Sequence, residues 1–452
     1  MTVPAAGAAA VVINPALGSS MPGGLADRQA SGVHDDLFVR ALVVEAGGEP
    51  LALLSVDCVA LHRDTVLAIR EAAQREAGVP GERVFVAATH THHGPPSATA
   101  FQSNRDEAYL ERLVGWCAGA LREARSRAGP AALGVGTVQV PGLQFNRRYW
   151  MKDGTVRTNP GIGNPEALRP AGPVNPEMRL LAFRATGQAP AALVVNYALH
   201  ACTIEGGEPL ISADFVAYLT QALQQALGAE TVVLFLNGAC GDINHWDVLG
   251  GRAEVAHGVG VAPPPPSTRN DQATRRTGLS LARAALDLLP DLDFREDWTV
   301  GEAHALLVAG MRQPDAERVA RAEAAFREQR PGWPRLEEEV YDYEVWHLAR
   351  GGEGEVEMEI QAVRLGPAAL VGIPAEVFAE IGLAIEAASP FATTAVVELA
   401  NGWEGYLPTR QAFAEGGYET RLARSSKLTD DTAEAVVAKA HEVLAALAKQ
   451  GW

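Results

Sequence analysis

The chain has 452 residues, of which 47% are hydrophobic and 21% are charged, and this balance is typical of a globular protein. Its formal net charge of −17 excludes a nucleic-acid backbone as the main partner, because phosphate binding needs a basic surface. The same charge gives no reason to expect binding to anionic membranes. No stretch reaches the ~18 consecutive apolar residues of a membrane helix, so we expect no integral membrane segment.

The N-terminal residues MTVPAAGAAAVVINP are rich in alanine, as signal peptides are, but the first basic residue of the chain is Arg28. Pro4 and Pro15 bracket the segment, and the basic region of a signal peptide is missing. We therefore expect a folded domain to begin here and the protein to be cytoplasmic. The cysteines are scattered singly, which indicates small buried residues rather than a disulfide framework or a zinc module: Cys58, Cys117, Cys202 and Cys240.

Short apolar runs recur along the chain, and each ends at polar residues able to do chemistry. The runs are 51–56, 84–88, 191–199, 231–236, 369–373 and 394–400. They are followed by Asp57, by the histidines of ATHTHHGP, by His200, by NGACGDINHW, by Pro374 and Glu376, and by NGWEGY. Such runs are typical of strands covered on both faces, and functional groups gather at the carboxyl ends of such strands.

Helical periodicity fills much of the space between these runs, for example over 110–121 and 215–226. Residues 314–330 indicate a solvated charged helix, and 430–449 an amphipathic C-terminal helix. Residues 355–362 alternate, which predicts a strand with one solvent-exposed face. The predicted fold is therefore α/β, a mixed β-sheet core flanked by helices with a site at the strand ends.

The proline-rich segment near 261–271 excludes a helix or a central strand, so we expect a loop there. The chain contains no internal repeat and no long linker. We therefore expect one domain over 1–452.

The segment ATHTHHGP, residues 88–95, places three histidines directly after an apolar run. His90 and His92 share a face if strand geometry persists. Neutral imidazoles are common zinc ligands, and a catalytic zinc ion usually has three protein ligands and one open position. The alternative is a polar loop with no metal. His200, at the end of another apolar run, favours the metal site.

ATHTHHGP resembles the THTHSGP signature of the neutral ceramidase family, zinc-dependent amidases that split the N-acyl bond of ceramide. Further blocks resemble the family in the same order along nearly the whole chain. They are GVHDDLFVRALVVE (32–45), FNRR (145–148), GACGDIN, VGIPAEVFAEIG and GYLPTRQAFAEGGYET. The resemblance implies one catalytic domain, and we expect no counterpart of the family's C-terminal immunoglobulin-like domain.

The resemblance also implies a role for individual residues. The zinc ligands that it implies are His90, His200, Glu376 and Tyr406. It places His92 and Arg147 beside the ion, in contact with the substrate or the transition state, and makes Tyr418 a donor to the developing oxyanion. Without the resemblance, the sequence favours the interpretation of Glu376 as a charge at a helix N-terminus.

The chain departs from the family pattern at the serine proposed as nucleophile, where it has Asn244. An amide cannot serve as that nucleophile, so we expect a metal-activated water to attack and Asn244 to donate a hydrogen bond to the substrate carbonyl. Asp242 or His93 is expected to pass a proton to the leaving amine. His93 and His245 replace a serine and a proline of the family, and a second metal there is left open.

We therefore predict a zinc-dependent hydrolase that cleaves an amide bond in a substrate smaller or more polar than ceramide. The partner would be a small-molecule or lipid-like amide, and a homo-oligomer is left open. The alternatives are a true ceramidase acting on N-acyl sphingoid bases, a metal-dependent esterase, lactonase or lyase, and a zinc-binding protein without turnover.

Overall fold

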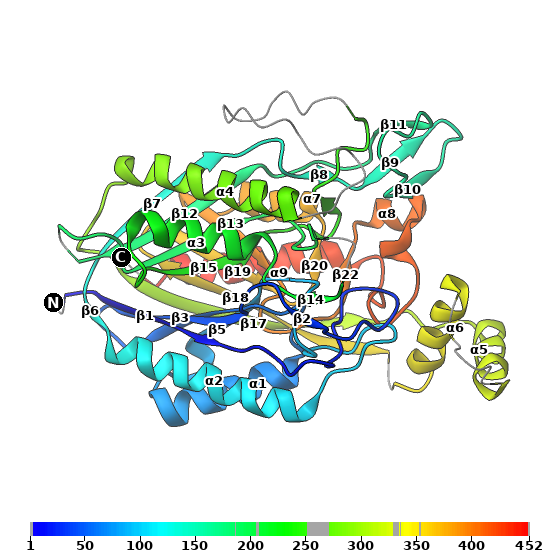
Figure 1. Ribbon diagram of the computed structural model, residues 1–452, viewed down its shortest axis with the longest axis horizontal. Coiled ribbons are helices and arrows are strands. Elements are labelled where there is room, and N and C mark those ends of the chain that lie inside the picture. The colour runs from blue at the N-terminus through cyan, green and yellow to red at the C-terminus, as the bar shows by residue number, and fades with distance from the viewer. Residues whose placement is uncertain are drawn as a thin grey trace.

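The computed structural model describes residues 3–185, 187–204, 208–250, 271–328, 334, 336–351 and 354–450. Three larger sheets, two of four strands and one of five, pack around a shared core and have helices on their outer faces (Figure 1). The fold is therefore α/β with mixed sheets, as the sequence predicts.

The first sheet has the strand order β5-β4-β3-β1-β6. Its strands are β1 (Ala5–Val12), β3 (Phe38–Glu45), β4 (Leu51–Val56), β5 (Val84–Ala88) and β6 (Gly129–Pro130). The pair β4 and β5 is parallel, and the other pairs are antiparallel. Helices α1 (Arg63–Ala72) and α2 (Glu107–Ser126) cover its outer face (Figure 1). The alanine-rich N-terminal segment is thus an inner strand of a sheet.

The second sheet has the order β15-β13-β12-β7. Its strands are β7 (Ala132–Gln139), β12 (Glu177–Arg184), β13 (Ala192–Tyr197) and β15 (Val232–Asn237). The pair β13 and β15 is parallel. Helices α3 (Phe215–Leu227) and α4 (Asp271–Leu288) pack on each other and on this sheet.

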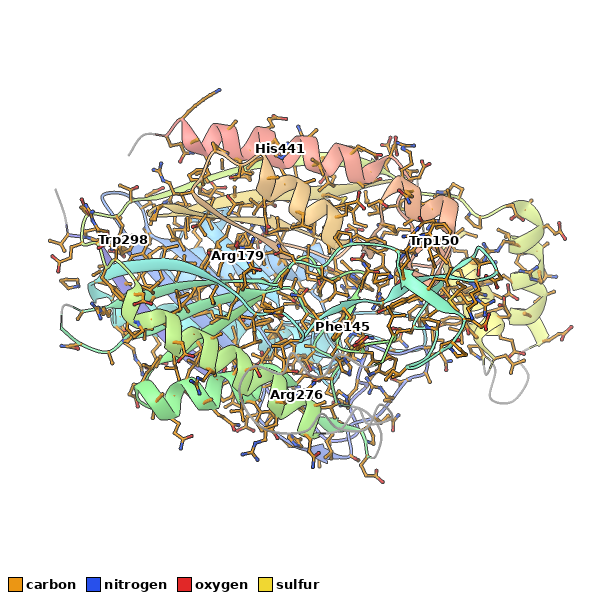
Figure 2. The ribbon with its side chains drawn as sticks, turned by 90° about the horizontal axis from the view of Figure 1, so that it is seen from above. Phe145, Trp150, Arg179, Arg276, Trp298 and His441 are labelled. Carbon is orange, nitrogen blue, oxygen red and sulfur yellow. The ribbon has the colours of Figure 1, made fainter. Side chains whose placement is uncertain are left out.

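The third sheet has the order β17-β18-β19-β21. Its strands are β17 (Val300–Gly310), β18 (Glu355–Leu365), β19 (Ala368–Ile373) and β21 (Thr393–Glu398). Here β19 and β21 form the parallel pair. Helices α7 (Ala379–Ala387) and α9 (Thr432–Ala448) pack on it. Figure 2 shows α9, marked by His441, on the opposite side of the molecule from α4, marked by Arg276.

Alternate residues of each strand face either the helices or a core shared by all three sheets. On β4, for example, Leu53 faces the shared core and Leu54 faces the helices. Ser55 Oγ donates a hydrogen bond to the Phe235 carbonyl (2.7 Å), which joins the first sheet to the second. Asn196 Nδ2 donates to the Val396 carbonyl (3.1 Å), which joins the second to the third. The apolar runs are therefore strands covered on both faces, as predicted.

Short strands and helices connect these layers. The short strands are β2 (Gly32–Val33), β8 (Phe145–Asn146), β9 (Arg148–Met151), β10 (Val156–Thr158), β11 (Ala167–Pro170), β14 (Leu210–Ile211), β16 (Ile243–Asn244), β20 (Glu376–Val377) and β22 (Tyr406–Leu407). The remaining α-helices are α5 (Ala316–Glu328), α6 (Glu337–Leu348) and α8 (Arg410–Glu415). Figure 1 places α5 and α6 together at one end of the molecule. None of the helices in the described part of the chain is both long enough and apolar enough to span a bilayer.

Several element predictions are confirmed. The C-terminal helix agrees within two residues, and α5 is the expected solvated helix. The exposed face expected for 355–362 is wrong beyond its first residues, because Glu359 is buried and paired with Arg63 (2.9 Å) and Arg70 (2.7 Å). The predicted loop near 261–271 lies outside the described residues except for Asp271, and the single catalytic domain stays a prediction.

Candidate metal and catalytic site

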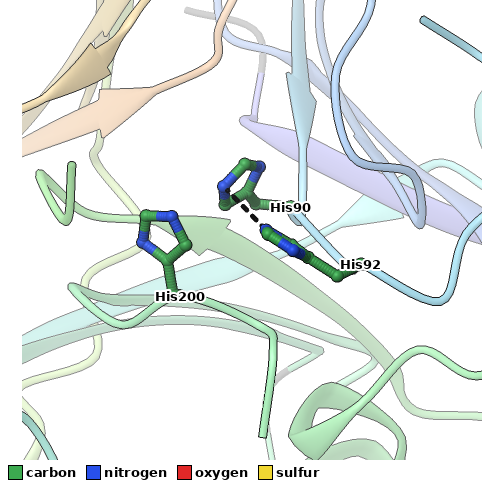
Figure 3. Close-up of side chains that lie close together, drawn as sticks. All are labelled: His90, His92 and His200. Carbon is green, nitrogen blue, oxygen red and sulfur yellow. Dashed lines mark hydrogen bonds between the residues drawn. The ribbon is translucent and has the colours of Figure 1, made fainter. Parts of the chain in front are cut away.

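Each of the three larger sheets has a strand that is followed by a residue of the candidate site, and the side chains of these residues lie close together. His90 follows β5, His200 follows β13 and Glu376 follows β19. Glu376 Oε2 lies 3.5 Å from His90 Nε2 and 3.6 Å from His200 Nε2. His92 Nε2 lies 3.4 Å from His90 Nε2, and Figure 3 shows the three imidazoles turned toward one another. Ligand atoms of the three histidines all lie within 4.8 Å of one another.

Backbone carbonyls from the neighbouring parallel strands orient two of these rings. His90 Nδ1 lies 2.7 Å from the carbonyl oxygen of Val59, which follows β4. His200 Nδ1 lies 2.8 Å from the carbonyl oxygen of Cys240, which follows β15. Since a carbonyl only accepts, each Nδ1 carries the hydrogen, and each Nε2 faces Glu376 Oε2.

The strand geometry expected to carry His90 and His92 on one face does not persist. β5 ends at Ala88, and His90 has a φ of 67°, a left-handed conformation that is uncommon for a residue with a side chain. The His90 amide donates to Cys58 O (2.9 Å) and the His92 amide to Ala201 O (3.0 Å), so both hydrogen bonds fix the turn. His90 and His92 converge because of this turn, and not because of strand alternation.

Glu376 and Tyr406 are direct partners in the parallel ladder between β20 and β22, so their side chains lie side by side. Trp403 Nε1 donates to Glu376 Oε1 (3.1 Å), whereas Glu376 Oε2 is buried and has no hydrogen-bond donor among the described residues. The Tyr406 hydroxyl is hydrogen-bonded to the Tyr418 hydroxyl. The pairing places Tyr406 beside the carboxylate that faces the histidines.

These residues fit a bound cation such as Zn²⁺. Two ligands that each lie about 2.0–2.1 Å from a tetrahedral zinc ion are about 3.3–3.4 Å apart, close to the spacings at Glu376 Oε2 and His90 Nε2. Two imidazole nitrogens and a buried carboxylate oxygen are also the donors that such an ion prefers. An oxygen left unpaired in a buried site is otherwise costly.

The charges at this point are coupled. Burial acts first to raise the pKa of Glu376, but its contacts with His200 and His90 outweigh burial, and the pKa falls well below its usual range. The pKa of His200 is lowered to about 3 by burial and by the neighbouring His90 and Arg147. Burial and the same two imidazoles also lower the pKa of His92. His200 and His92 are therefore neutral at pH 7, as metal coordination requires.

Arg147 lies against the histidines and is held from behind by Glu419. Its Nη1 lies 3.4 Å from His200 Nε2, and its Nη2 donates to Tyr418 OH (3.3 Å). Its Nε donates to Glu419 Oε1 (2.8 Å), and the Glu419 side chain is fully buried. Burial raises the pKa of Tyr418, so its hydroxyl stays protonated and able to donate at neutral pH. Arg147 and Tyr418 thus present donors next to the cluster.

Asn244 and Asp242 lie on the loop that pairs with the Arg147 segment. Asn244 Oδ1 accepts from the His245 amide (2.7 Å), and its Nδ2 lies 3.4 Å from Asn159 Oδ1. Asp242 Oδ1 accepts from the Ala379 amide at the start of α7 (2.8 Å). Its Oδ2 accepts from an asparagine amide of β8 (2.6 Å). Both Asp242 oxygens are engaged in these bonds, so its part in proton transfer stays a prediction.

The buried Asp242 carboxyl predicts a pH dependence of stability. Burial raises its pKa from 3.8 to about 6, so between about pH 4 and pH 6 the folded state binds more protons than the unfolded state. Stability is therefore lost as the pH rises through this window, by about 2–3 kcal/mol from this group. Asp242→Asn should remove that slope, as measured by urea unfolding at several pH values. Asp430→Asn, at an exposed position, is the control that keeps the slope; an unchanged slope in Asp242→Asn contradicts the assignment.

The other two histidines singled out in the sequence lie apart from the cluster. His93 Nδ1 and Nε2 lie 2.9 Å and 3.2 Å from the carbonyls of Leu210 and Ile204. Both ring nitrogens of His245 are buried without a hydrogen-bond partner among the described residues, and burial, with Arg276, lowers its pKa to about 3. Within the described residues the metal-ligand geometry therefore brings together His90, His92 and His200, without His93 or His245.

Several residues of the site were missed by the sequence reasoning. Glu398 Oε2 accepts from the amides of Cys240 (2.9 Å) and Val377 (3.0 Å), and so ties two site loops together. The sequence signal that could have revealed Glu398 is that it is the single charged residue in the apolar run 394–400. Trp403 lies three residues before Tyr406 in the sequence, and Glu419 directly follows Tyr418. Both segments were noted from the sequence, but only the structure shows which residues Trp403 and Glu419 contact.

Comparison with known proteins gives the fold. No family model matches the chain. A segment of 208 residues is 24% identical to the neutral ceramidase of Pseudomonas aeruginosa, covering 42% of this chain and 29% of that protein. The crystal structure of neutral ceramidase from Pseudomonas aeruginosa is similar with a TM-score of 0.76 at 20% identity, over 99% of this chain and 75% of that one. A structure of a ceramidase complexed with C2 is similar with a TM-score of 0.72 at 19% identity, over 99% and 76%.

Fold and site together define a protein with the fold of neutral ceramidase and a histidine cluster able to bind a metal. One protein that this chain resembles in both sequence and structure is the neutral ceramidase of Pseudomonas aeruginosa. The sequence match spans less than a third of that relative's length. The resemblance inferred from ATHTHHGP and the later blocks is thereby confirmed.

Proposed function

We propose that this protein is a zinc-dependent hydrolase that cleaves an amide bond in a substrate smaller or more polar than ceramide. The observation that carries the proposal is the convergence of His90 Nε2, His200 Nε2 and the unpartnered Glu376 Oε2. The similarity to neutral ceramidase supports amide hydrolysis as the reaction class. Two imidazoles and a carboxylate are ordinary zinc ligands, and Tyr406 beside Glu376 is proposed as the fourth.

An ion held by these donors would polarise a substrate carbonyl and lower the pKa of a water molecule at the site. The remaining steps fall to side chains of the chain itself. We assign stabilisation of the developing oxyanion to Tyr418, whose protonated hydroxyl lies 3.3 Å from Arg147 Nη2. Glu419 and the Gly241 carbonyl hold the guanidinium in place (2.8 and 2.7 Å), so it acts as a fixed positive charge.

His92 is proposed to face the substrate. It is half-buried, whereas His90 and His200 are fully enclosed, so it lies at the open side of the cluster. Its lowered pKa keeps the ring neutral, and a neutral imidazole can accept a proton or a hydrogen bond. Asn244 is proposed to hydrogen-bond the substrate carbonyl, and the Asp242 carboxyl to pass a proton to the leaving amine. The Arg147 amide donates to the Asp242 backbone carbonyl (2.8 Å), which holds the Asp242 loop beside the Arg147 segment.

A combined metal and turnover assay tests the proposal. The purified protein is expected to contain about one zinc ion per chain and to hydrolyse short-chain N-acyl amides, to lose both after chelation, and to regain both when zinc is restored. Faster turnover of esters or lactones would favour the esterase reading. Faster turnover of ceramide would make the protein a true ceramidase. Metal binding without turnover of any of these substrates would favour a binding protein, and full activity after complete chelation would overturn the metal role.

A further inference from the structure

A polar cavity of about 440 Å³ lies beside the metal cluster, behind Trp403. Besides Trp403, the residues that give it its character are His62, Arg105, Arg424 and Lys427. The Trp403 indole joins the two sites, because its Nε1 donates to Glu376 Oε1 (3.1 Å) while its ring lies against His62, with 5.5 Å between the ring centroids. The cavity and the cluster are therefore separated by a single side chain.

The same loops build both sites. Val59, whose carbonyl orients His90, lies three residues before His62 on the loop after β4. Trp403 lies three residues before Tyr406 on the loop after β21. The loops that position His90 and Tyr406 therefore also carry two residues of the cavity wall, His62 and Trp403.

The charges around the cavity are arranged with cations toward it. Arg105, Arg424 and Lys427 line it, while three of the four carboxylates that pair with them are not among its lining residues. These partners are Glu107 of Arg105 (2.7 Å), Glu344 of Arg424 (2.6 Å) and Glu404 of Lys427 (2.7 Å). Asp64 is the single carboxylate among the seven lining residues, and Arg105 already pairs with it (2.8 Å).

His62 adds a neutral donor. Its Nε2 accepts from the Thr99 amide (3.3 Å), so the hydrogen is on Nδ1. Burial, followed by the positive charges of Arg105 and Lys427, lowers the pKa of His62 to about 4. The imidazole is therefore uncharged at neutral pH and lies in a positive potential.

We propose that this cavity is the subsite for an anionic group, a carboxylate or a phosphate, carried by the amide substrate next to its scissile bond. The inference rests on the proposed amide hydrolysis and names its substrate class, an N-acyl compound with an acidic substituent. Arginine and lysine recognise such groups through charge-assisted hydrogen bonds. A hydrocarbon chain in the same cavity would remove water from these charged groups and offer them no hydrogen bond in return, which is unfavourable.

Binding of small ions tests the subsite without turnover. Succinate and inorganic phosphate are titrated into the purified protein by calorimetry, with neutral succinamide as the matched control ligand. We expect one of the anions to bind and succinamide not to bind; the anion that binds more tightly identifies the group. Arg105→Gln should weaken that binding at least about tenfold, since a charged hydrogen bond is lost. Its partners Asp64 and Glu107 are 60% and 70% exposed, so the variant should fold normally.

Lys427→Gln should weaken anion binding by a similar factor. Because this change leaves the Glu404 carboxylate unpaired, the double variant Lys427→Gln/Glu404→Gln is measured beside it and should also bind the anion weakly. Arg410→Gln, an exposed cation on α8 paired with Glu434, is the control and should bind the anion as the wild type does. The ratio of kcat/KM for N-octanoylglycine to that for N-octanoylethanolamine should fall about tenfold in Arg105→Gln and stay constant in Arg410→Gln.

The outcomes separate the two proposals. Anion binding that is unaffected in both cavity variants but lost in His200→Ala would place the anion at the metal cluster and overturn the subsite, as would equal binding of succinamide. Failure of the wild type to bind either anion overturns it as well, whether or not amides are hydrolysed. Anion binding that depends on Arg105 and Lys427, in a protein that hydrolyses no amide, would support the subsite and overturn the proposed function alone.

Discussion

His90→Ala and His200→Ala are each expected to reduce the bound metal from about one ion per chain to near zero and to reduce amide turnover at least about a hundredfold. Loss of a residue that only supports a ligand typically costs about 10–100-fold in metal affinity, and loss of a ligand itself costs more. Both rings direct Nε2 at Glu376 Oε2 from 3.5 and 3.6 Å, so neither can be replaced by the other. Metal content after dialysis, measured by mass spectrometry, checks this result.

His304→Ala is a matched control, because His304 is an exposed histidine of β17. It should keep both metal and turnover. Full metal content in both His90→Ala and His200→Ala would place the ion elsewhere. His92→Ala then decides the role of the third ring: retained metal with lost turnover supports the substrate-side role inferred from the sequence, and lost metal makes His92 a ligand.

Glu419→Gln is expected to lower the free energy of unfolding by about 3–5 kcal/mol, because it leaves the buried Arg147 without its counter-charge. Glu419 is fully buried between two arginines. It accepts from Arg147 Nε (2.8 Å) on one oxygen and from Arg148 Nη1 (3.3 Å) and Thr158 Oγ1 (2.7 Å) on the other. Glutamine preserves the shape but offers one acceptor oxygen in place of two.

Urea unfolding of the wild type and the variant measures this difference. Glu434→Gln, which breaks the exposed pair with Arg410 on the surface, is the control and should change stability by less than about 1 kcal/mol. A change of similar size in both variants would show that Glu419 is not the centre of a buried charge network. Turnover should fall in Glu419→Gln as well, since Arg147 loses its main support.

The sequence predicted the strands and the residues that follow them because both depend on local patterns. Runs such as 51–56 and 231–236 are apolar on both faces, and the structure buries both faces of β4 and β15. His90, His200 and Glu376 were reached from the same pattern together with a family resemblance. Glu376 in particular needed the resemblance, because the local pattern alone favours a charge at a helix N-terminus.

The remaining features depend on contacts between distant segments. The burial of Glu359 follows from Arg63 and Arg70, which lie 296 and 289 residues away, and no local alternation can reveal such partners. The left-handed turn at His90 is similarly fixed by the carbonyl of Cys58, in the loop after β4. Trp403 was visible as a tryptophan after a strand, but its bond to Glu376 depends on how β20 and β22 align.

Each of the three sheets contributes one parallel pair, and the loops after both strands of every pair reach the cluster. In the first two pairs, the loop after one strand supplies a proposed ligand and the loop after the other supplies its support, as with His90 and Val59 or His200 and Cys240. No single sheet therefore contains a working site, and a partly assembled chain with one sheet undocked has no place for the ion. Metal bound there would favour only the fully assembled state, so it would couple the unfolding of all three sheets into one cooperative transition and report on the last step of assembly.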